Sequence, residues 1–309
     1  MPSSPDYFFL DGIPLGAGDI ALAAQYNAYA DVEASRLLLW LQGQWTYVDF
    51  DEDVIRSLAY DAASATLYML GKNGSVYRLG GAGAGIGFTH ASIAGTLAEE
   101  AVVDPEERGE LLRIRVLDGR VLVCGLGGQL LERRGGSWQS LGFETPIAES
   151  PDFEDVSLDE QGWPLAVGWA GAAYRFTPQG PQRLDLPSNL IFSTLVADGP
   201  DRHLLCGNQG VAFEIIGNIF RDCSVEEPQG NLWSIVRHAG LIYACEPGRL
   251  LVRKGEVWET ESVSQRIAGP SFHRLLSTGT ELWSFGADHV FVKREEGQWQ
   301  QFAVIGNEI

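Results

Sequence analysis

The sequence of 309 residues is short of positive charge and has no long hydrophobic run. Its 22 Lys and Arg face 41 Asp and Glu, and the formal net charge of −19 disfavours non-specific binding to nucleic acid or to an anionic membrane. No apolar stretch approaches the roughly 18 residues of a membrane helix, and the N-terminus has no basic segment ahead of a hydrophobic one. We therefore expect a cytoplasmic protein with no membrane span and no secretory signal.

Cysteine is scarce as well, with four residues that form no C-x-x-C pair, which argues against a zinc knuckle and a dense disulfide framework. Cys124, Cys206 and Cys245 each stand just before a turn, where we expect them to pack as small buried hydrophobes. Cys223 lies in an outer run and is expected to be exposed. The five histidines show no H-x-H or H-E-x-x-H spacing, so we assign no metal site.

The Gly-rich segment LGGAGAGIG (79–87) contains no G-K-[ST] sequence, and its neighbours have the pattern of strands. A phosphate-binding loop needs a helix N-terminus directly after it. We interpret the segment as a flexible insertion and expect no cofactor.

What the sequence does contain is a repeat. Its 37 Gly and 14 Pro are mostly spread along the chain and mark many tight turns. Six segments share one form, which is an apolar run, a turn that begins with Gly or an equivalent, and a second alternating run that ends in a charged residue. These segments are 67–78, 121–133, 164–175, 203–214, 241–253 and 281–293.

The position three residues after the start of each turn serves as an anchor for the repeat. An ungapped match of SRLLLWLQGQW to HVFVKREEGQW adds a seventh anchor to the six. Most anchors recur at intervals of about 40 residues, which is the length of a propeller blade. The anchors are Ser35, Gly74, Gly128, Gly171, Gly210, Arg249 and His289.

A further apolar run precedes each turn and another run follows it, and all have the length and composition of β-strands. Four strands per unit indicate an all-β fold, a seven-bladed β-propeller of four-stranded antiparallel blades. A single large β-sandwich does not explain the equal spacing. We predict one propeller domain over 1–309 with an insertion at about 80–110, in which LAEEAVV (97–103) is a candidate for a short helix. YFFL (7–10) has no assigned role, and the closure of the ring stays open.

Two further sets of residues follow the repeat. Charged residues stand four positions after six anchors, and we interpret them as ion pairs between blades: Arg78, Glu132, Arg175, Glu214, Arg253 and Lys293. Aromatic residues open the outer runs and are expected to pack between neighbouring blades: Trp45, Trp138, Phe220, Trp258 and Trp299.

The innermost strands of a propeller converge on the entrance of its central channel, which makes that entrance the candidate binding site. Strand periodicity alone does not fix which residues point inwards. Mixed charges and one aromatic ring suit a polar ligand or a side chain of a partner protein. The candidates are Arg56, Arg113, Asp155, Ser193, Trp233, His273 and Arg274, and we assign no catalytic residue.

The blade pattern, seen in 120–143 and 281–302, resembles that of bacterial propellers of the BNR-like or photosystem II stability/assembly-factor-like type. In those, an apolar strand, a G-x-x-G turn, a short strand and a G-x-W strand recur. The resemblance covers 20–302 and concerns the fold, because such propellers include glycosidases, assembly factors and protein-binding scaffolds. The S-x-D-x-G-x-x-W Asp-box of sialidases is absent here.

Three functions stay open at this point. The first is a non-enzymatic protein-binding scaffold, for which the negative charge favours a basic partner, and one version is an immunity protein that neutralises a basic bacterial toxin. The second is a glycan-directed or other hydrolase at the channel entrance, with Asp155 and Glu154 as candidate carboxylates, although adjacent residues of a strand face opposite ways and cannot together form the catalytic pair. The third is an assembly factor, as the resemblance implies. We favour the first and expect a monomer.

Overall fold

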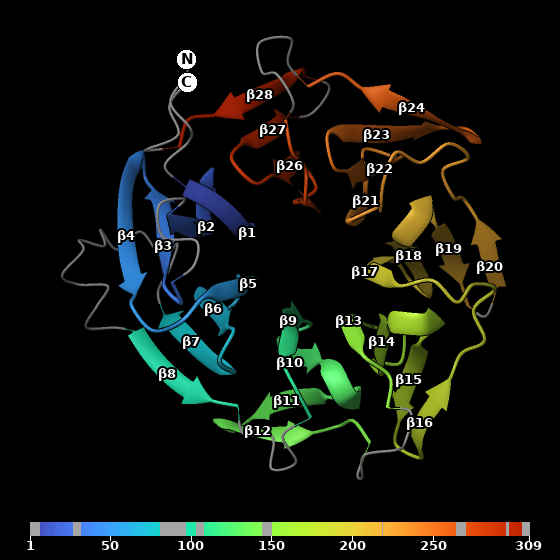
Figure 1. The fold of residues 1–309 in the computed structure, drawn as a ribbon, viewed down its shortest axis with the longest axis horizontal. Coiled ribbons are helices and arrows are strands. Elements are labelled where there is room, and N and C mark those ends of the chain that lie inside the picture. The colour runs from blue at the N-terminus through green and yellow to red at the C-terminus, as the bar shows by residue number, and fades with distance from the viewer. Residues whose placement is uncertain are drawn as a thin grey trace.

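Figure 1 shows the computed structural model, in which seven four-stranded sheets surround a central axis. All strand pairs within the sheets are antiparallel, as in blade 1 between β1, β2, β3 and β4. Each blade consists of four consecutive strands, with the first strand nearest the axis. The predicted seven-bladed β-propeller is therefore confirmed. The structure describes residues 7–26, 32–80, 97–102, 108–143, 150–217, 219–263, 270–294 and 297–304.

The blades follow one another in chain order. Blades 1 to 4 contain β1 (Tyr7–Gly16), β2 (Asp19–Tyr26), β3 (Ser35–Leu41), β4 (Gln44–Phe50), β5 (Ile55–Asp61), β6 (Thr66–Gly71), β7 (Ser75–Gly80), β8 (Leu97–Ala101), β9 (Leu111–Leu117), β10 (Arg120–Gly125), β11 (Leu130–Arg134), β12 (Ser137–Ser140), β13 (Phe153–Leu158), β14 (Pro164–Gly168), β15 (Ala173–Thr177) and β16 (Gly180–Arg183). Blades 5 to 7 contain β17 (Phe192–Gly199), β18 (Arg202–Gly207), β19 (Ala212–Ile216), β20 (Ile219–Asp222), β21 (Ser234–His238), β22 (Leu241–Glu246), β23 (Arg249–Lys254), β24 (Val257–Glu261), β25 (Arg274–Ser277), β26 (Glu281–Phe285), β27 (Val290–Arg294) and β28 (Trp299–Phe302).

Five of the seven anchors lie in the turns between the second and third strands, and Ser35 and Arg249 are the first residues of the third strands β3 and β23. Three of the turns form short 3₁₀ helices, η2 (Leu126–Gly128), η3 (Trp169–Gly171) and η4 (Asn208–Gly210). The two glycines of the G-x-x-G pattern serve different purposes. A Cβ on Gly207 would lie 2.0 Å from the Ile191 carbonyl oxygen, which accepts a 2.9 Å hydrogen bond from the Asn208 N–H. Gly210 has a φ of +75°, which favours glycine. The first glycine thus leaves room for the backbone of the inner strand, and the second adopts the left-handed conformation that the turn requires.

Seven hydrophobic clusters lie between neighbouring blades, one at each of the seven interfaces. Alternate residues of one strand enter different clusters. In β6, Leu67 and Met69 pack against blade 1, whereas Tyr68 and Leu70 pack against blade 3. Period-two alternation therefore buries both faces of a sheet, which explains why the strands read as continuous apolar runs.

The predicted aromatic set packs between blades. Trp45 of β4 lies against the cluster that blade 1 shares with blade 7, where its ring is 6.2 Å from that of Phe302. The indole N–H of Trp258 in blade 6 donates to the Cys223 carbonyl of blade 5 at 2.7 Å. Trp138, Phe220 and Trp299 also join clusters that two blades share, which confirms this expectation.

The ring closes between blades 7 and 1 without any exchange of strands. The segment YFFL, which had no predicted role, begins the innermost strand β1. The Phe9 N–H donates to the Ala287 carbonyl at 2.6 Å, and Phe9 packs with Trp283 and Phe285 of blade 7. Closure therefore relies on side-chain packing and on contacts between the inner strands.

Several expectations need correction. LAEEAVV does not begin a helix, because Leu97–Ala101 is the outer strand β8, which completes blade 2 by pairing with β7. Most of the predicted insertion at 80–110 lies outside the described residues. Cys223 is 4% exposed rather than exposed, because Trp258 of the next blade covers this outer segment.

The charged set is only partly as predicted. Two members of the set, Glu214 and Lys293, link neighbouring blades. Glu214 in blade 5 pairs with Arg237 in blade 6 at 2.6 Å, and Lys293 in blade 7 pairs with Glu261 in blade 6 at 2.6 Å. The other four members find partners within their own blade, because neighbouring strands of one sheet lie closer than the next sheet: Arg78 with Glu100, Glu132 with Arg120, Arg175 with Asp159 and Arg253 with Glu256.

Within the described parts of the chain, no helix has the length and apolarity that a membrane crossing requires.

Candidate functional site

A cavity of about 450 Å³ opens at one end of the central channel. Its wall is built from equivalent positions on the seven inner strands. In five blades this position is an extra residue in the inner strand, where the pairing register shifts by one. Such a bulge redirects a side chain, here towards the channel. The seven equivalent residues are Leu10, Arg56, Leu112, Glu154, Ser193, Trp233 and His273, and all line the cavity.

The residue before each of these seven positions is apolar and buried, as Phe153 shows in blade 4. The residue after each is polar, and these seven form what we call the polar ring: Asp11, Ser57, Arg113, Asp155, Thr194, Ser234 and Arg274. Several members bond the inner strand of the next blade. Asp11 accepts from the Leu58 N–H at 2.7 Å, and Ser234 Oγ accepts from the Leu275 N–H at 3.0 Å. The polar ring therefore joins blades around the axis.

Two ion pairs occupy the polar ring. Asp155 is fully buried and receives the Arg115 guanidinium at 2.8 Å and 2.5 Å, together with the backbone N–H groups of Val156 and Leu195 at 2.9 Å each. Burial alone would raise the pKa of Asp155, but the charge and hydrogen bonds of Arg115 lower it. Each Asp155 oxygen accepts two hydrogen bonds, so the carboxylate is held as an anion that joins blade 4 to Arg115 of blade 3 and Leu195 of blade 5.

The second pair joins Asp11 of blade 1 to Arg274 of blade 7. Burial lowers the pKa of Arg274 to about 10, while the negative charge of Asp11 opposes that shift. At this value the guanidinium is still charged at neutral pH. The pair therefore holds opposite charges where the first and last blades meet.

Arg113 has only a long ion pair, with the same Asp155 carboxylate that Arg115 binds. Its Nε is buried and lies 4.0 Å from Asp155 Oδ1, an oxygen that already binds Arg115. Among the described residues, the Arg113 guanidinium makes no hydrogen bond. Arg56, further out on the wall, is paired with Glu110 at 2.9 Å and with the Leu111 carbonyl at 3.2 Å. The cavity therefore presents one guanidinium that shares its nearest carboxylate with a closer arginine and makes no hydrogen bond of its own among the described residues.

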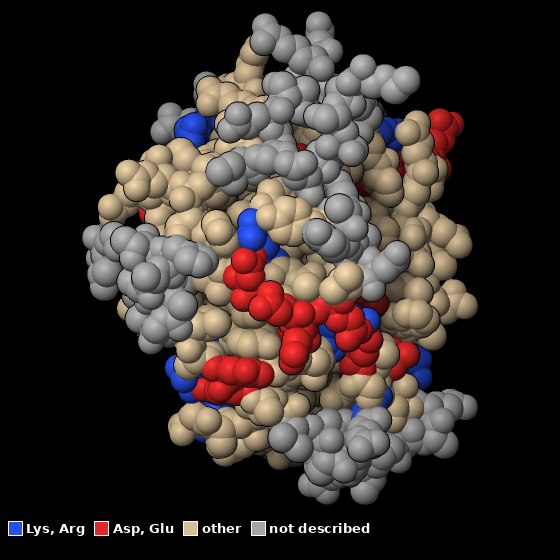
Figure 2. Space-filling view, turned by 60° about the vertical axis from the view of Figure 1, so that its left-hand side comes forward, with Lys and Arg blue, Asp and Glu red and all other residues tan. Residues whose placement is uncertain are grey.

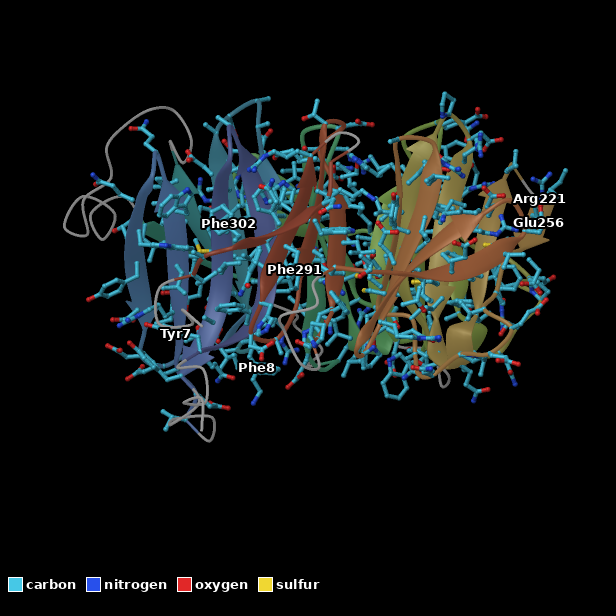
Figure 3. All side chains as sticks on the ribbon, turned by 90° about the horizontal axis from the view of Figure 1, so that it is seen from above. Tyr7, Phe8, Arg221, Glu256, Phe291 and Phe302 are labelled. Carbon is cyan, nitrogen blue, oxygen red and sulfur yellow. The ribbon has the colours of Figure 1, made fainter. Side chains whose placement is uncertain are left out.

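Aromatic side chains stand at the mouth of this cavity. Phe8 is 40% exposed and Trp233 is 42% exposed, and both line it. Trp169, 46% exposed, donates its indole N–H to Glu154 Oε1 at 2.7 Å, which places it beside the mouth. Figure 3 shows Phe8 at one face of the ring, while Phe291 lies between the two faces. Phe8, Trp169 and Trp233 together form the aromatic rim of the cavity.

Six of the seven candidate residues from the sequence line this cavity, namely Arg56, Arg113, Ser193, Trp233, His273 and Arg274. Asp155 does not line it, because its side chain is turned into the polar ring behind Arg115. Burial lowers the pKa of His273, which keeps this imidazole neutral near pH 7.

Sequence reasoning named Glu154 only together with Asp155 and missed Phe8, Asp11, Arg115 and Trp169. A signal for the positions of Glu154 and Asp11 was present in the repeat. Each inner strand begins with an apolar residue, a variable residue and a polar residue, as in FLD (9–11) and FED (153–155). Alignment of these triplets would have placed Leu10 and Glu154 in the channel wall, and Asp11 beside it.

The described residues contain no group of three or more His, Cys, Asp or Glu side chains that could hold a metal ion. A second cavity, of about 280 Å³, lies on the other side of the polar ring and is lined mainly by apolar residues such as Ile13 and Val196. The polar ring thus separates the channel into two cavities of different character.

No family model matches this chain. Among curated proteins, it is 22% identical over 269 residues to the immune protein Tsi7 of Pseudomonas aeruginosa, and the match covers 82% of each chain.

The solved structures that resemble this one are also propellers. YCF48 of Cyanidioschyzon merolae superposes with a TM-score of 0.66 at 12% identity, over 96% of this chain and 97% of that one. YCF48 bound to D1 peptide gives 0.63 at 14% identity, over 97% and 94%. The WD40 propeller domain of Doa1 gives 0.68 at 14% identity, over 99% and 97%. These likenesses concern the fold, which resembles that of assembly-factor propellers, as expected.

Proposed function

We propose that this protein is an immunity protein, which binds a basic protein toxin in the cytoplasm and neutralises it by forming a complex. The observation that carries the proposal is the similarity to the immune protein Tsi7, which extends over 82% of both chains and therefore includes most of the blades. YCF48, a propeller of similar fold, is bound to a peptide in one of its structures, which agrees with a protein partner.

The mouth of the 450 Å³ cavity is the surface that suits this role best. Tryptophan and arginine are the residues most enriched at energetic centres of protein interfaces. Here Trp169 and Trp233 stand beside Arg56 and Arg113 on one face of the ring. Exposed aromatic rings in such a group give a partner a large apolar area to bury.

The charge distribution favours a basic partner. Figure 2 shows Asp and Glu gathered in a band on the side of the molecule that carries β4 and β8. Asp49 and Asp51 line one surface hollow, where Arg36 pairs with Asp49, and Glu33 and Glu52 line another, where Lys72 pairs with Glu33. With a net charge of −19, this surface would accelerate encounter with a positively charged protein, more strongly at low salt.

A growth experiment tests the proposal. Each gene adjacent to this one is induced in a heterologous bacterial host, and any that proves toxic is induced with or without this protein. We expect growth to be restored by the wild-type chain, and restored less by Trp233→Ala, because the substitution removes part of the aromatic rim. Val257→Ala is the matched control, since Val257 is 62% exposed on the outer strand β24. Failure of the wild-type chain to protect, with both proteins expressed, would contradict the proposal.

Purified proteins give a second readout. The toxin and this protein should co-elute in size-exclusion chromatography as a complex of one copy of each. The association rate should fall as salt is raised, because the steering field is screened. A rate independent of salt would remove the argument for a basic partner, while leaving complex formation itself in place.

A further inference from the structure

The deep end of the mouth cavity contains more positive than negative charge. Three guanidiniums, Arg113, Arg115 and Arg274, meet two carboxylates, Asp11 and Asp155. Arg115 and Arg274 each have a carboxylate partner, which leaves Arg113 over. The Arg113 side chain is 21% exposed, and its Nε comes no closer than 4.0 Å to Asp155 Oδ1, an oxygen that Arg115 already occupies. Arg113 is therefore accessible from the cavity and can pair with a counter-charge that enters it.

Glu154 does not supply that counter-charge. It lines the same cavity, but its Oε1 accepts the Trp169 indole N–H, and no ion pair within 4.0 Å joins it to an arginine among the described residues. Glu110 is paired with Arg56. The cavity wall therefore has a negative group near its rim and an unmatched positive group further in.

The remaining wall of the cavity is suited to an apolar group. Leu10, Leu112 and Pro247 line it together with Phe8 and Trp233. The cavity volume of about 450 Å³ lies within the roughly 300–1,000 Å³ of typical ligand sites. The polar ring closes the cavity on its inner side, so an occupant has to enter from the mouth and end beside Arg113.

We infer that the channel mouth is a recognition site for an acidic side chain flanked by apolar residues on a loop of the protein partner, and that Arg113 binds its carboxylate. A guanidinium and a carboxylate form parallel charge-assisted hydrogen bonds, which a neutral amide of the same shape cannot match. This inference rests on the proposed function in that the occupant belongs to a protein. The acidic surface then accelerates encounter with a partner that is basic overall, and the channel binds one acidic residue of that partner.

Three blocked tripeptides test the site directly: acetyl-Leu-Asp-Leu-amide, its Asn counterpart and its Lys counterpart, with inorganic phosphate as a fourth probe. Binding is followed by calorimetry and by amide shifts in NMR spectra. We expect the Asp peptide to bind about tenfold or more tightly than the Asn peptide, as for hydrogen bonds to charged groups. The Lys peptide should bind more weakly still. Equal binding of Asp and Asn peptides, tighter binding of the Lys peptide or of phosphate, or no binding at millimolar concentration would each overturn the inference.

Arg113→Met should remove the preference for Asp over Asn, while Arg113→Lys should keep part of it. Arg221→Met is the matched control, because Arg221 is 62% exposed in its side chain and lies at the outer rim of the ring, far from Phe8 (Figure 3). Glu154→Gln should not weaken the Asp peptide, since it removes a like charge. If Arg113→Met does not fold, two measurements on the wild-type protein still test the inference. They are the ratio of the affinities for the Asp and Asn peptides and the shift of the Trp233 indole signal on binding of the Asp peptide.

The outcomes separate this inference from the proposed function. Protection against the toxin without selective binding of the Asp peptide would overturn the carboxylate site alone. Selective, Arg113-dependent binding of the Asp peptide without protection would overturn the immunity function alone.

Discussion

Asp11 and Arg274, which lie near opposite ends of the chain, form an ion pair in the central channel. The side chains are 2% and 9% exposed, and Asp11 also accepts the Leu58 N–H at 2.7 Å. One carboxylate thus joins blade 1 to blade 7 and to blade 2. Because the first and last blades exchange no strand, this pair helps hold the ring closed.

The closing pair gives the first prediction. Asp11→Asn leaves the Arg274 charge buried without a counter-charge, and we expect a loss of about 3–5 kcal/mol in the free energy of unfolding. The double variant Asp11→Asn with Arg274→Met should lose less than the sum of the two single losses, since it removes both charges. Urea unfolding followed by tryptophan fluorescence measures all three.

The control for this cycle is a surface pair in the same blade. Arg36 and Asp49 are 2.6 Å apart, and the Asp49 side chain is 41% exposed. Asp49→Asn should cost at most about 1 kcal/mol. Additive losses in the Asp11 and Arg274 cycle would mean that the two charges stabilise the ring independently.

The second prediction concerns Asp155, the candidate carboxylate of a hydrolase. Asp155→Asn should lower the free energy of unfolding by about 3–5 kcal/mol, because it leaves Arg115 buried and unpaired. Glu154→Gln, one residue earlier and partly exposed, should change it by less than about 0.5 kcal/mol. If Asp155→Asn is as stable as the wild type and instead abolishes turnover in a glycan or ester panel, the hydrolase function gains support.

The third prediction concerns the first glycine of the G-x-x-G turns. A Cβ at Gly207 would lie 2.0 Å from the Ile191 carbonyl oxygen and 2.8 Å from the Phe192 Cα, so the inner strand has to move. We expect Gly207→Ala to cost about 1–3 kcal/mol or more. Gly80→Ala is the control, because no atom of the described residues lies within 4 Å of a Cβ there. Circular dichroism melts compare the two, and an equal effect would refute the explanation by close approach.

The fourth prediction concerns pH. His203 is buried, and its Nε2 is 2.9 Å from the Leu158 carbonyl oxygen. Burial lowers the pKa of His203, although this carbonyl, Asp159 and Asp201 oppose the shift. Burial, aided by Lys293, also lowers the pKa of His238. In the unfolded chain a histidine takes up a proton near pH 6.5, whereas His203 and His238 in the folded protein take it up only at lower pH. Their contribution to the free energy of unfolding is therefore complete above about pH 6.5 and is lost as the pH falls below it.

Urea midpoints between pH 7.5 and 5.5 should fall with pH in the wild-type chain and fall less in the double variant His203→Gln with His238→Gln. His289 acts in the opposite direction, because its hydrogen bond to Asp288 raises its pKa. Its stabilisation is present below pH 6.5 and is lost as the pH rises through the folded-state pKa. His289→Asn should therefore steepen the fall on acidification. An unchanged slope in the double variant would show that other groups control it.

Much of the fold could be predicted because repetition makes local patterns informative. The anchors located the turns before the third strands, and in Gly210 this reflects a positive φ that glycine favours. The predictions that were wrong concerned segments whose pattern occurs only once in the chain. LAEEAVV has helix-forming residues, yet pairing with β7 makes it a strand. Tertiary hydrogen bonding outweighs intrinsic propensity of a few tenths of a kcal/mol per residue.

The channel was predicted less completely than the fold. Polar residues of the inner strands could be named, and six of them line one cavity. The bulges could not be foreseen, and a bulge reverses which residues face the axis. Asp155 therefore lies behind the wall, where it is neutralised by Arg115, while Glu154 beside it lines the cavity.

The last prediction concerns the four cysteines, all of which are buried. Burial raises the pKa of the Cys223 thiol to about 12, and it raises that of Cys124, Cys206 and Cys245 as well. Because the thiolate is the reactive form, none should react with a thiol reagent at pH 7.5 until the blades open. We expect no labelling of the folded protein within minutes and four labels in denaturant, counted by mass spectrometry. Rapid labelling of Cys223 in the folded state would show that the contact between its segment and Trp258 is not maintained in solution.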